Sequence, residues 1–425
     1  MPVTALAFLA SHFLSLLGNG IAAVALPLIV LQITGSPASV GLVSVATAGP
    51  ALLVGLGAGL VLDRVNRRTC SVVSDVVSAA AVVAIPVVEL VHGLDLAWLI
   101  ALAVVGAFGD VPGMTARQVL APALARHTGV GMERLIGLRQ SMTSMALIIG
   151  PAAAGALLAV FDGTTVLLLT AATSATAALL TLAVPHRLGR IDDRPAERPS
   201  IGSELAAGFR VLRRSRFLTG TVGLTLGLAV VIGGLQGLVL PVYFEAVGRP
   251  DLLGLVLTAL AAGMLAGTGV FAAVGHRVPR RVWVGTALVG TTAGLATIAT
   301  LASAWVVLAG AALLGVCNAL VGAVLGVLQA ERTPEATRGR VLSLQNALLQ
   351  VAAPAGVGLA GVVAEVGSPV AAGFSVVAVW VAVLVAIVAS GALRDLEPVS
   401  DGPSLPPDHE AGSTPIGPLA RSDGG

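Results

Sequence analysis

The chain has 425 residues, of which 56% are hydrophobic and only 11% are charged, whereas soluble domains have about 25% charged residues. This composition excludes a water-soluble globular protein, because no soluble core could bury so much apolar sequence. A bilayer accepts it in helices of roughly 20 apolar residues, each of which satisfies its own backbone hydrogen bonds. The net charge of +2 gives no reason to expect a nucleic-acid partner. We therefore predict an all-α membrane protein.

Twelve charge-poor segments are long enough to cross a membrane as helices. The first lacks the positive start and the cleavage signature of a signal peptide, so we expect it to remain as a span. No charge occurs from Val282 to Ala330, and the turn between spans nine and ten is placed near Ser303 and Trp305 only because one helix cannot be so long. The predicted spans are 4–31, 37–62, 70–92, 97–120, 134–160, 164–185, 217–244, 251–274, 281–303, 304–330, 339–364 and 369–393.

The placement of arginine predicts the orientation of these spans. Cytoplasmic loops hold most of the basic residues of a membrane protein. If the N-terminus lies inside, the outer loops receive only Arg249. The inner segments then receive Arg64, Arg67, Arg68, Arg126, Arg134, the arginines of 187–216, Arg277, Arg280, Arg281, Arg332, Arg338 and Arg394. Both termini are therefore predicted to lie in the cytoplasm.

A polar interruption divides the chain into an N-terminal half, 1–185, and a C-terminal half, 217–393. The linker between them, 186–216, carries apolar residues at helical intervals, which indicates a short helix lying on the inner membrane face. A solvated basic linker explains the same pattern equally well. These apolar residues are Ile201, Leu205, Phe209 and Leu212. The tail 394–425 is rich in Pro, Gly, Ser and Asp and is expected to be disordered.

The two halves repeat one another in sequence. Residues 25–28, Ala-Leu-Pro-Leu, match 239–242, Val-Leu-Pro-Val, and the segment 35–41 matches 248–254. The second match follows a one-residue slip, and the segment 63–68 then matches 276–281 at the same offset as the second match. Such a repeat predicts two six-helix bundles related by an axis along the membrane normal, an arrangement found in a large group of secondary transporters.

The loop after the second span carries a specific motif. Residues 59–68 read Gly-Leu-Val-Leu-Asp-Arg-Val-Asn-Arg-Arg, which resembles the signature loop of the major facilitator superfamily, with Asn66 in place of its glycine. Asn tolerates a left-handed backbone, so we expect the turn to survive. The resemblance implies the major facilitator fold and a conformational latch that stabilises the outward-facing state. Its residues would be Gly59, Asp63, Arg64, Arg67 and Arg68; the alternative is a basic loop that only sets topology.

The fifth span contains Gly150, Pro151 and Gly155, which resemble the Gly-Pro motif of the antiporter branch of this superfamily. The resemblance implies an exporter, and the alternative is a helix kink that serves packing alone. Residues 353–356, Ala-Pro-Ala-Gly, are the counterpart in span eleven. The segments 204–218 and 338–344 resemble the subgroup of enterobactin exporters and macrolide efflux proteins.

Ionisable residues inside membrane spans are costly and are therefore functional candidates. Asp110 lies in the middle of span four, with Arg117 seven residues later on roughly the same face. We hypothesise that Asp110 couples protons to transport by alternating between a protonated state and one paired with Arg117 or another cation; a fixed structural pair is the alternative. Asp75, in span three, is a weaker candidate, expected to reach water or a loop arginine near the inner face.

Six uncharged polar residues within the spans are candidates to line a central cavity, although each could instead form a hydrogen bond between helices. They are Asn19, Gln140, Gln236, Asn318, Gln345 and Asn346. The aromatic content of 3%, with Tyr243 as the single tyrosine, does not favour an aromatic cage for flat cations.

Several function classes are excluded by what the sequence lacks. The chain has no lysine and hence no phosphate-binding Gly-x-x-x-x-Gly-Lys loop, so ATP is not the expected energy source. Its six histidines have no metal-ligand spacing, and no catalytic triad is recognisable. No enzyme, metal or cofactor is therefore predicted. Cys70 and Cys317 are expected to be packing residues.

The combined prediction is a monomeric secondary transporter of a bacterial plasma membrane that exports a small amphipathic compound in exchange for protons. Three alternatives stay open at the level of sequence. The exported compound could be an endogenous siderophore or secondary metabolite, the protein could be a proton-coupled importer, or it could be a sensor or lipid-handling protein that does not transport.

Overall fold

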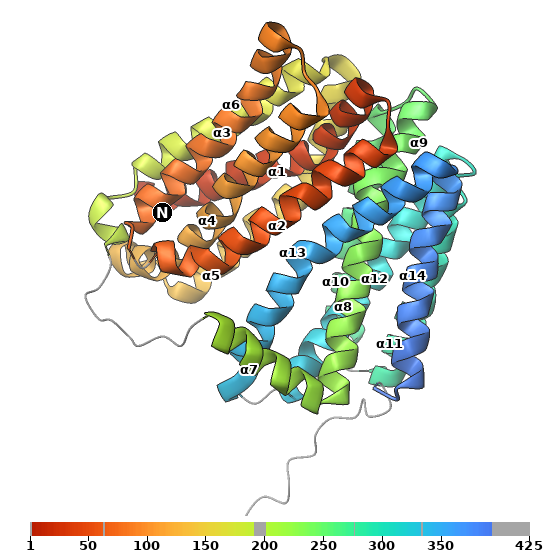
Figure 1. Cartoon of the computed structure of the whole chain (residues 1–425). Helices are drawn as coiled ribbons and strands as arrows, with labels where there is room; N and C mark the ends of the chain where they lie inside the picture. The colour runs from red at the N-terminus through yellow and green to blue at the C-terminus, as the bar shows by residue number, and fades with distance from the viewer. Residues whose placement is uncertain (1, 63, 191–200, 276, 333–334, 393–425) are drawn as a thin grey trace, which may run out of the picture.

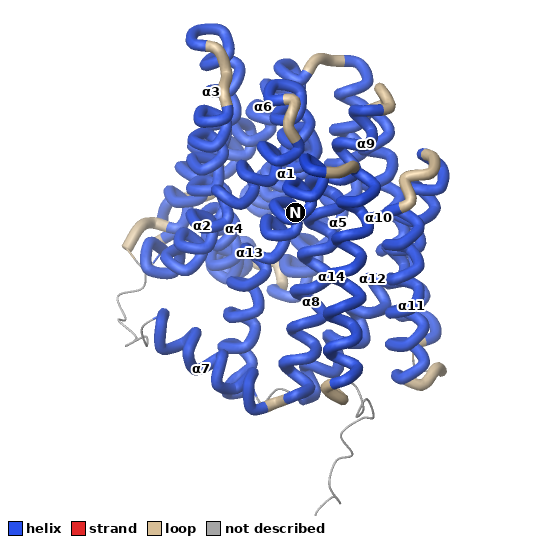
Figure 2. Tube along the Cα trace, turned by 45° about the vertical axis from the view of Figure 1, so that its right-hand side comes forward, coloured by secondary structure: helices blue, strands red, loops and turns tan. Residues whose placement is uncertain are grey.

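The computed structural model describes residues 2–62, 64–190, 201–275, 277–332 and 335–392. Over these residues the regular structure is entirely helical (Figures 1 and 2). Twelve helical segments are long and apolar enough to cross a membrane, which confirms the predicted all-α class. The expected disorder of 394–425 concerns residues outside the described part of the chain.

The N-terminal half is a bundle of six helices whose ends are set by local signals. Gly35 and Gly129 end the first and fourth helices with left-handed φ angles of 65° and 68°, which glycine adopts without cost. Asp95 caps the fourth helix by accepting a hydrogen bond from the Trp98 amide. The six helices are α1 (Val3–Thr34), α2 (Pro37–Leu62), α3 (Arg67–His92), α4 (Leu96–Thr128), α5 (Met132–Val160) and α6 (Gly163–Leu182).

The C-terminal half contains the remaining spans. A 3-10 turn, η1 (His186–Gly189), follows α6, and α7 (Ile201–Arg214) packs across the ends of α8 and α13 (Figures 1 and 2). The seventh span comprises α8 (Arg216–Gly234), η2 (Leu235–Val239) and α9 (Leu240–Ala246). The others are α10 (Asp251–Val274), α11 (Arg280–Ala299), α12 (Ala304–Arg332), α13 (Glu335–Val366) and α14 (Pro369–Ala389).

The structure departs from the predicted spans in informative ways at three places. Span four was predicted to end at 120, but α4 continues to Thr128, where Arg126 and His127 in the last turn favour the negative end of the helix dipole. The break between spans nine and ten lies at residues 300–303 and uses Leu301 with a φ of 46°. Within span seven, η2 is a π-helical turn, which precedes Pro241, a residue that has no N–H for the helical ladder.

The contacts between the two halves follow the sequence repeat. The packing of α2 against α13 is matched by that of α10 against α5. A Cβ atom on Gly41 would lie 3.2 Å from the Cα of Gly358, and one on Gly155 would lie 2.8 Å from the Cα of Gly254. Gly41 and Gly254 are equivalent positions of the repeat. The same backbone-to-backbone approach, which small residues permit, therefore occurs twice.

The two bundles meet at the end of the molecule opposite the N-terminus and splay apart toward the end where α7 lies (Figure 1). Three hydrogen bonds between described residues of the two halves lie at the closed end. Gln32 donates to Glu245 at 3.1 Å. The Glu365 carboxylate accepts from the Ser36 hydroxyl at 2.8 Å and from the Ala38 amide at 3.1 Å. An acid of the C-terminal half thus caps the start of α2 in the N-terminal half.

If the chain is the transporter that its sequence resembles, a cross-link across this closed end should stop transport. The change is Ser36→Cys with Glu365→Cys, in a background in which Cys70 and Cys317 are replaced by alanine. A short bifunctional thiol reagent should join the pair because the two side chains are in contact, and it should hold the halves together. Transport should fall to background. When the reagent is a cleavable one, transport should recover after the cross-link is cut. Each single cysteine variant is the control. Full transport by the cross-linked protein would show that the halves need not separate at this contact.

Candidate functional site

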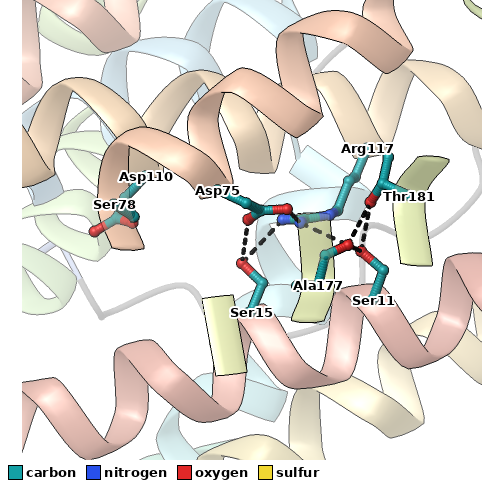
Figure 3. Close-up of polar contacts among 8 residues, drawn as sticks. All are labelled: Ser11, Ser15, Asp75, Ser78, Asp110, Arg117, Ala177 and Thr181. Carbon is teal, nitrogen blue, oxygen red and sulfur yellow. Dashed lines mark hydrogen bonds and ion pairs between the residues drawn. The ribbon is translucent and has the colours of Figure 1, made fainter. Parts of the chain in front are cut away.

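A buried ion pair lies inside the N-terminal bundle. Arg117 of α4 pairs with Asp75 of α3, and the two residues are 2% and 4% exposed (Figure 3). Arg117 also donates to the hydroxyl of Ser15 at 3.0 Å, and Ser15 donates to Asp75 at 3.1 Å. A charge in a membrane interior is tolerated when it is paired and hydrogen-bonded in this way.

Hydroxyl groups extend this cluster to two further helices. Ser11 of α1 accepts from Arg117 at 3.5 Å and donates to the Ala177 carbonyl of α6 at 2.9 Å. It also shares a hydrogen bond of 2.6 Å with Thr181. The polar cluster therefore joins α1, α3, α4 and α6 at one level of the bundle (Figure 3).

Asp110 lies apart from this ion pair. Its carboxylate accepts a hydrogen bond from Ser78 of α3, and Figure 3 shows the two residues on the side of Asp75 that faces away from Arg117. The helices α3 and α4 are antiparallel neighbours, so Ser78, one turn after Asp75, meets Asp110, two turns before Arg117. In this conformation Arg117 therefore pairs with Asp75 and not with Asp110, so the fixed Asp110–Arg117 pair is not seen here, and the alternation of Asp110 between two states stays a hypothesis. The expectation that Asp75 reaches water or a loop arginine is wrong, because Asp75 is buried against Arg117.

A pocket of 360 Å³ opens beside Asp110. Its walls come from α1, α2, α3, α4 and α6, together with Gly237 of η2. Asp110 is the one ionisable residue among the described residues that line it, and these include no aromatic side chain. The other polar lining residues are Asn19, Ser44, Thr47, Ser78, Thr170 and Ser174.

One of the six predicted cavity residues lies at this pocket, namely Asn19. Gln236 lines a separate space of only 10 Å³ in the C-terminal half. Gln140 and Asn346 are exposed and Asn318 is half-buried. The remaining residue, Gln345, is half-buried and its side-chain oxygen has no hydrogen-bond partner among the described residues. The structure therefore does not gather the six into one site.

Sequence analysis missed His12 as a member of this region. Its side chain is 6% exposed, and its Nε2 atom lies 3.1 Å from the Thr143 hydroxyl of α5. His12 and Ser11, which contacts Arg117, are adjacent on α1. His12 could have been found from the sequence, because an ionisable group within a span is costly and therefore a functional candidate. The histidines were tested only for metal-ligand spacing.

The predicted latch loop is anchored within its own half in this conformation. Arg68 donates to the carbonyls of Thr181 and Leu182 at the end of α6, at 3.4 and 2.6 Å. Gly59 lies in α2, Arg64 is exposed and Arg67 is half-buried. Asp63 lies outside the described residues, as does His276 of the second copy.

Asn66, which replaces the glycine of the family motif, does not use a left-handed backbone. Its φ is −53°, and its side chain caps α3 by accepting from the amides of Arg68 and Thr69. It also donates to the His186 carbonyl at 3.0 Å. The substitution is therefore accommodated by helix capping, which Asn performs well.

The glycine-proline motif of α5 lies at two helix crossings. A Cβ atom on Gly150 would be 3.0 Å from the Cα of Gly20 in α1, within the same half. Gly155 approaches Gly254 of the other half, as described above. Pro151 lies between them, inside the helix. The motif is thus part of the packing surface and lies outside the pocket lining.

A family model described as the Major Facilitator Superfamily matches residues 8–248 and 222–422 of the chain. The chain belongs to this superfamily. The resemblance predicted from the loop 59–68 is confirmed. Family membership and the twelve spans identify the protein as a multi-pass bacterial membrane transporter and not an enzyme.

Curated relatives are similar to this superfamily member over most of their length. The multidrug efflux pump Tap of Mycobacterium tuberculosis is 33% identical over 351 residues, which cover 81% of this chain and 83% of Tap. Macrolide efflux protein A of Streptococcus pyogenes is 23% identical over 365 residues, covering 84% of this chain and 88% of that protein.

Solved structures share the fold at low sequence identity. The nucleoside transporter NupG, as a D323A mutant, has a TM-score of 0.75 and 14% identity, covering 91% of this chain and 99% of NupG. A bacterial homolog of the human lysosomal transporter Spinster, in an inward-facing and unoccupied conformation, has a TM-score of 0.69 and 14% identity, covering 95% and 100% of the two chains.

Removing Arg117 is expected to destabilise the protein by leaving Asp75 buried without its partner. Breaking a buried ion pair costs about 3–5 kcal/mol, whereas replacing both partners by apolar groups is often neutral. Arg117→Met should therefore lower the thermal stability of the purified protein more than the double variant Asp75→Leu with Arg117→Met. Thermal unfolding in detergent measures the order. A double variant no more stable than Arg117→Met would contradict a structural dependence on this pair.

Proposed function

We propose that the protein exports small amphipathic organic compounds from the cell in exchange for protons. Its relatives are, by name, a multidrug efflux pump and a macrolide efflux protein, which supports export as the direction. The observation that carries the proposal is the position of Asp110, a carboxylate inside the membrane that borders a ligand-sized pocket and is not paired with Arg117.

The orientation that we propose has both termini in the cytoplasm, as the arginine distribution favours. The splayed end of the molecule, which carries α7 and the arginine-rich loops, then faces inward, and the contact of Glu365 with Ser36 closes the outer end. In this orientation α7 lies at the inner membrane face, with Leu212 buried and Phe209 exposed. The described conformation is then the inward-facing one.

We infer which residue exchanges the proton from the balance of charges in the N-terminal bundle. Asp75, Asp110 and Arg117 together would carry one net negative charge if both acids were ionised. A membrane interior disfavours an uncompensated charge. Because Arg117 already neutralises Asp75, the acid that gains or loses the balancing proton in our proposal is Asp110.

The transport cycle follows from this balance. In the inward-facing state Asp110 releases its proton to the cytoplasm as substrate enters the pocket. The halves then rock about their glycine crossings, and the outer end opens. A proton from outside neutralises Asp110, and the substrate leaves. In the outward-facing state the loop 59–68 would meet the other half and act as the latch that the family motif implies. One chain contains the whole path, so we propose a monomer.

Inside-out membrane vesicles test direction and coupling together. With a lumen made acidic, a labelled amphipathic compound should accumulate inside vesicles that contain the protein, and a protonophore should abolish the accumulation. Vesicles without the protein are the control. Accumulation in right-side-out vesicles instead would make the protein an importer. Accumulation that is unaffected by collapse of the proton gradient would overturn the antiport proposal.

A further inference from the structure

The pocket beside Asp110 belongs almost entirely to one half of the transporter. Five helices of the N-terminal bundle form its walls, and the C-terminal half contributes Gly237 of the π turn η2. Its 360 Å³ is near the lower end of the range for small-molecule pockets, roughly 300–1,000 Å³. Such a space accepts a compact organic molecule and not a large macrocycle.

The chemistry of the walls restricts the ligand further. The lining is dominated by aliphatic side chains, among them Leu26, Val43, Ile85 and Leu102. The described lining residues include no basic side chain that could hold an anion. Asp110 is the one charged group, and it lies at the inner end of the pocket next to Ser78 and Asn19. The pocket is therefore lined mainly by aliphatic side chains and has one acidic group, Asp110, at one end.

The charged groups near the pocket do not form an ion pair with the Asp110 carboxylate. On α4, Arg117 is engaged by Asp75, Ser15 and Ser11. On α3, Asp75 is a second acid and would repel an ionised Asp110. The polar groups that face the pocket from α2 and α6 are uncharged hydroxyls. On α1 the nearest ionisable residue is His12, which lies beyond the Arg117 cluster and contacts Thr143.

Asp110 is half-buried inside the membrane-spanning bundle, and an acid in this position is stabilised by a proton or by a cationic ligand. We propose that the pocket binds a compact, mainly aliphatic organic cation with one positive charge, whose cationic group pairs with Asp110. This inference rests on the proposed export function and deepens it, because it names the class of compound that is carried. Because Gly237 of the C-terminal half lines the pocket, a bound ligand would contact both halves, so its binding would depend on their relative position.

Equilibrium binding to the purified full-length protein tests the inference without any gradient. The probe is the tetrapropylammonium ion, compared with N,N-dipropylbutanamide, a neutral compound of similar size. We expect saturable binding of the cation by calorimetry and at least about tenfold weaker binding of the amide. Asp110→Asn, which keeps the size of the side chain and its hydrogen bond with Ser78, should remove that preference.

A second variant tests the location of the site without changing the acid. Ala103 lines the pocket and Ala101, two residues earlier on α4, is exposed and does not. Ala103→Leu should fill part of the pocket and weaken cation binding at least about tenfold, whereas the matched control Ala101→Leu should bind as the unmodified protein does. Elution of both variants as single species in size-exclusion chromatography confirms folding.

Three results would overturn the inference: equal binding of the cation and the amide, unchanged cation binding by Ala103→Leu, or no saturable binding of the cation. None of these would remove the export proposal, since the vesicle assay measures gradient-driven accumulation of a compound wherever in the protein that compound binds. Conversely, cation binding with the expected variant pattern but without gradient-driven accumulation would leave the pocket assignment standing and refute antiport.

Discussion

Asp110→Asn is expected to abolish substrate accumulation driven by a proton gradient while downhill exchange of labelled for unlabelled substrate continues at saturating concentration. Asparagine preserves the volume of the side chain and its hydrogen bond with Ser78, but it cannot release a proton. The halves should therefore still alternate between their two conformations, but this change should no longer be coupled to the proton gradient. Accumulation in vesicles and exchange in proteoliposomes measure the two properties separately.

Glu89→Gln is the matched control for this prediction, because Glu89 is an exposed acid at the far end of α3. It should retain gradient-driven accumulation. Asp110→Glu keeps a titratable carboxyl group and should retain part of the accumulation. If Asp110→Asn still accumulated substrate under a proton gradient, the proton would have to travel through another group.

Gly155→Leu is expected to push the halves apart at the closed end. A Cβ atom there would lie 2.8 Å from both the Cα of Gly254 and the Asp251 carbonyl oxygen, so a larger side chain cannot fit without movement of α10. Overpacking of this kind costs about 1–3 kcal/mol, which corresponds to a roughly 5- to 150-fold shift of a two-state equilibrium. Transport should fall accordingly.

The cross-linking yield of the Ser36→Cys and Glu365→Cys pair measures that shift directly and should decrease in Gly155→Leu. Gly254→Leu should have the same effect from the opposite side of the crossing. Gly137→Leu is the control on the same helix, because no atom lies within 4 Å of a Cβ atom at Gly137. An unchanged yield in Gly155→Leu, or an equal loss in Gly137→Leu, would refute the role of this crossing.

Hydropathy was enough to predict the twelve spans of this protein, because a span must be long and apolar whatever it packs against. It missed the end of α4, whose last turn before Gly129 is polar and carries Arg126 and His127. The repeat in sequence aligned Gly41 with Gly254, and the structure shows that both lie at equivalent crossings between the halves. The π turn at 235–239 was not predicted, because Pro241 can be accommodated by a kink, a π turn or a break, and tertiary packing determines which one forms.

The candidate site was less predictable because its contacts join different helices. Sequence spacing placed Asp110 and Arg117 on one face of α4, and both are indeed in the polar interior. The partner of Arg117 is Asp75 of α3, and this pairing depends on the register between two antiparallel helices, which spacing along one helix does not contain. The cavity candidates Gln140 and Asn346 do not line the pocket for the same reason, since a polar residue within a span can face a pocket, lipid or a neighbouring helix.

The measurement that most directly tests the exchange of a proton for substrate at Asp110 is proton release by the purified protein in weakly buffered solution when a transported compound is added. We expect about one proton to be released per cationic ligand bound, from the charge balance of Asp75, Asp110 and Arg117, and none from Asp110→Asn at ligand saturation. Binding without proton release, or the same release from Asp110→Asn, would contradict it.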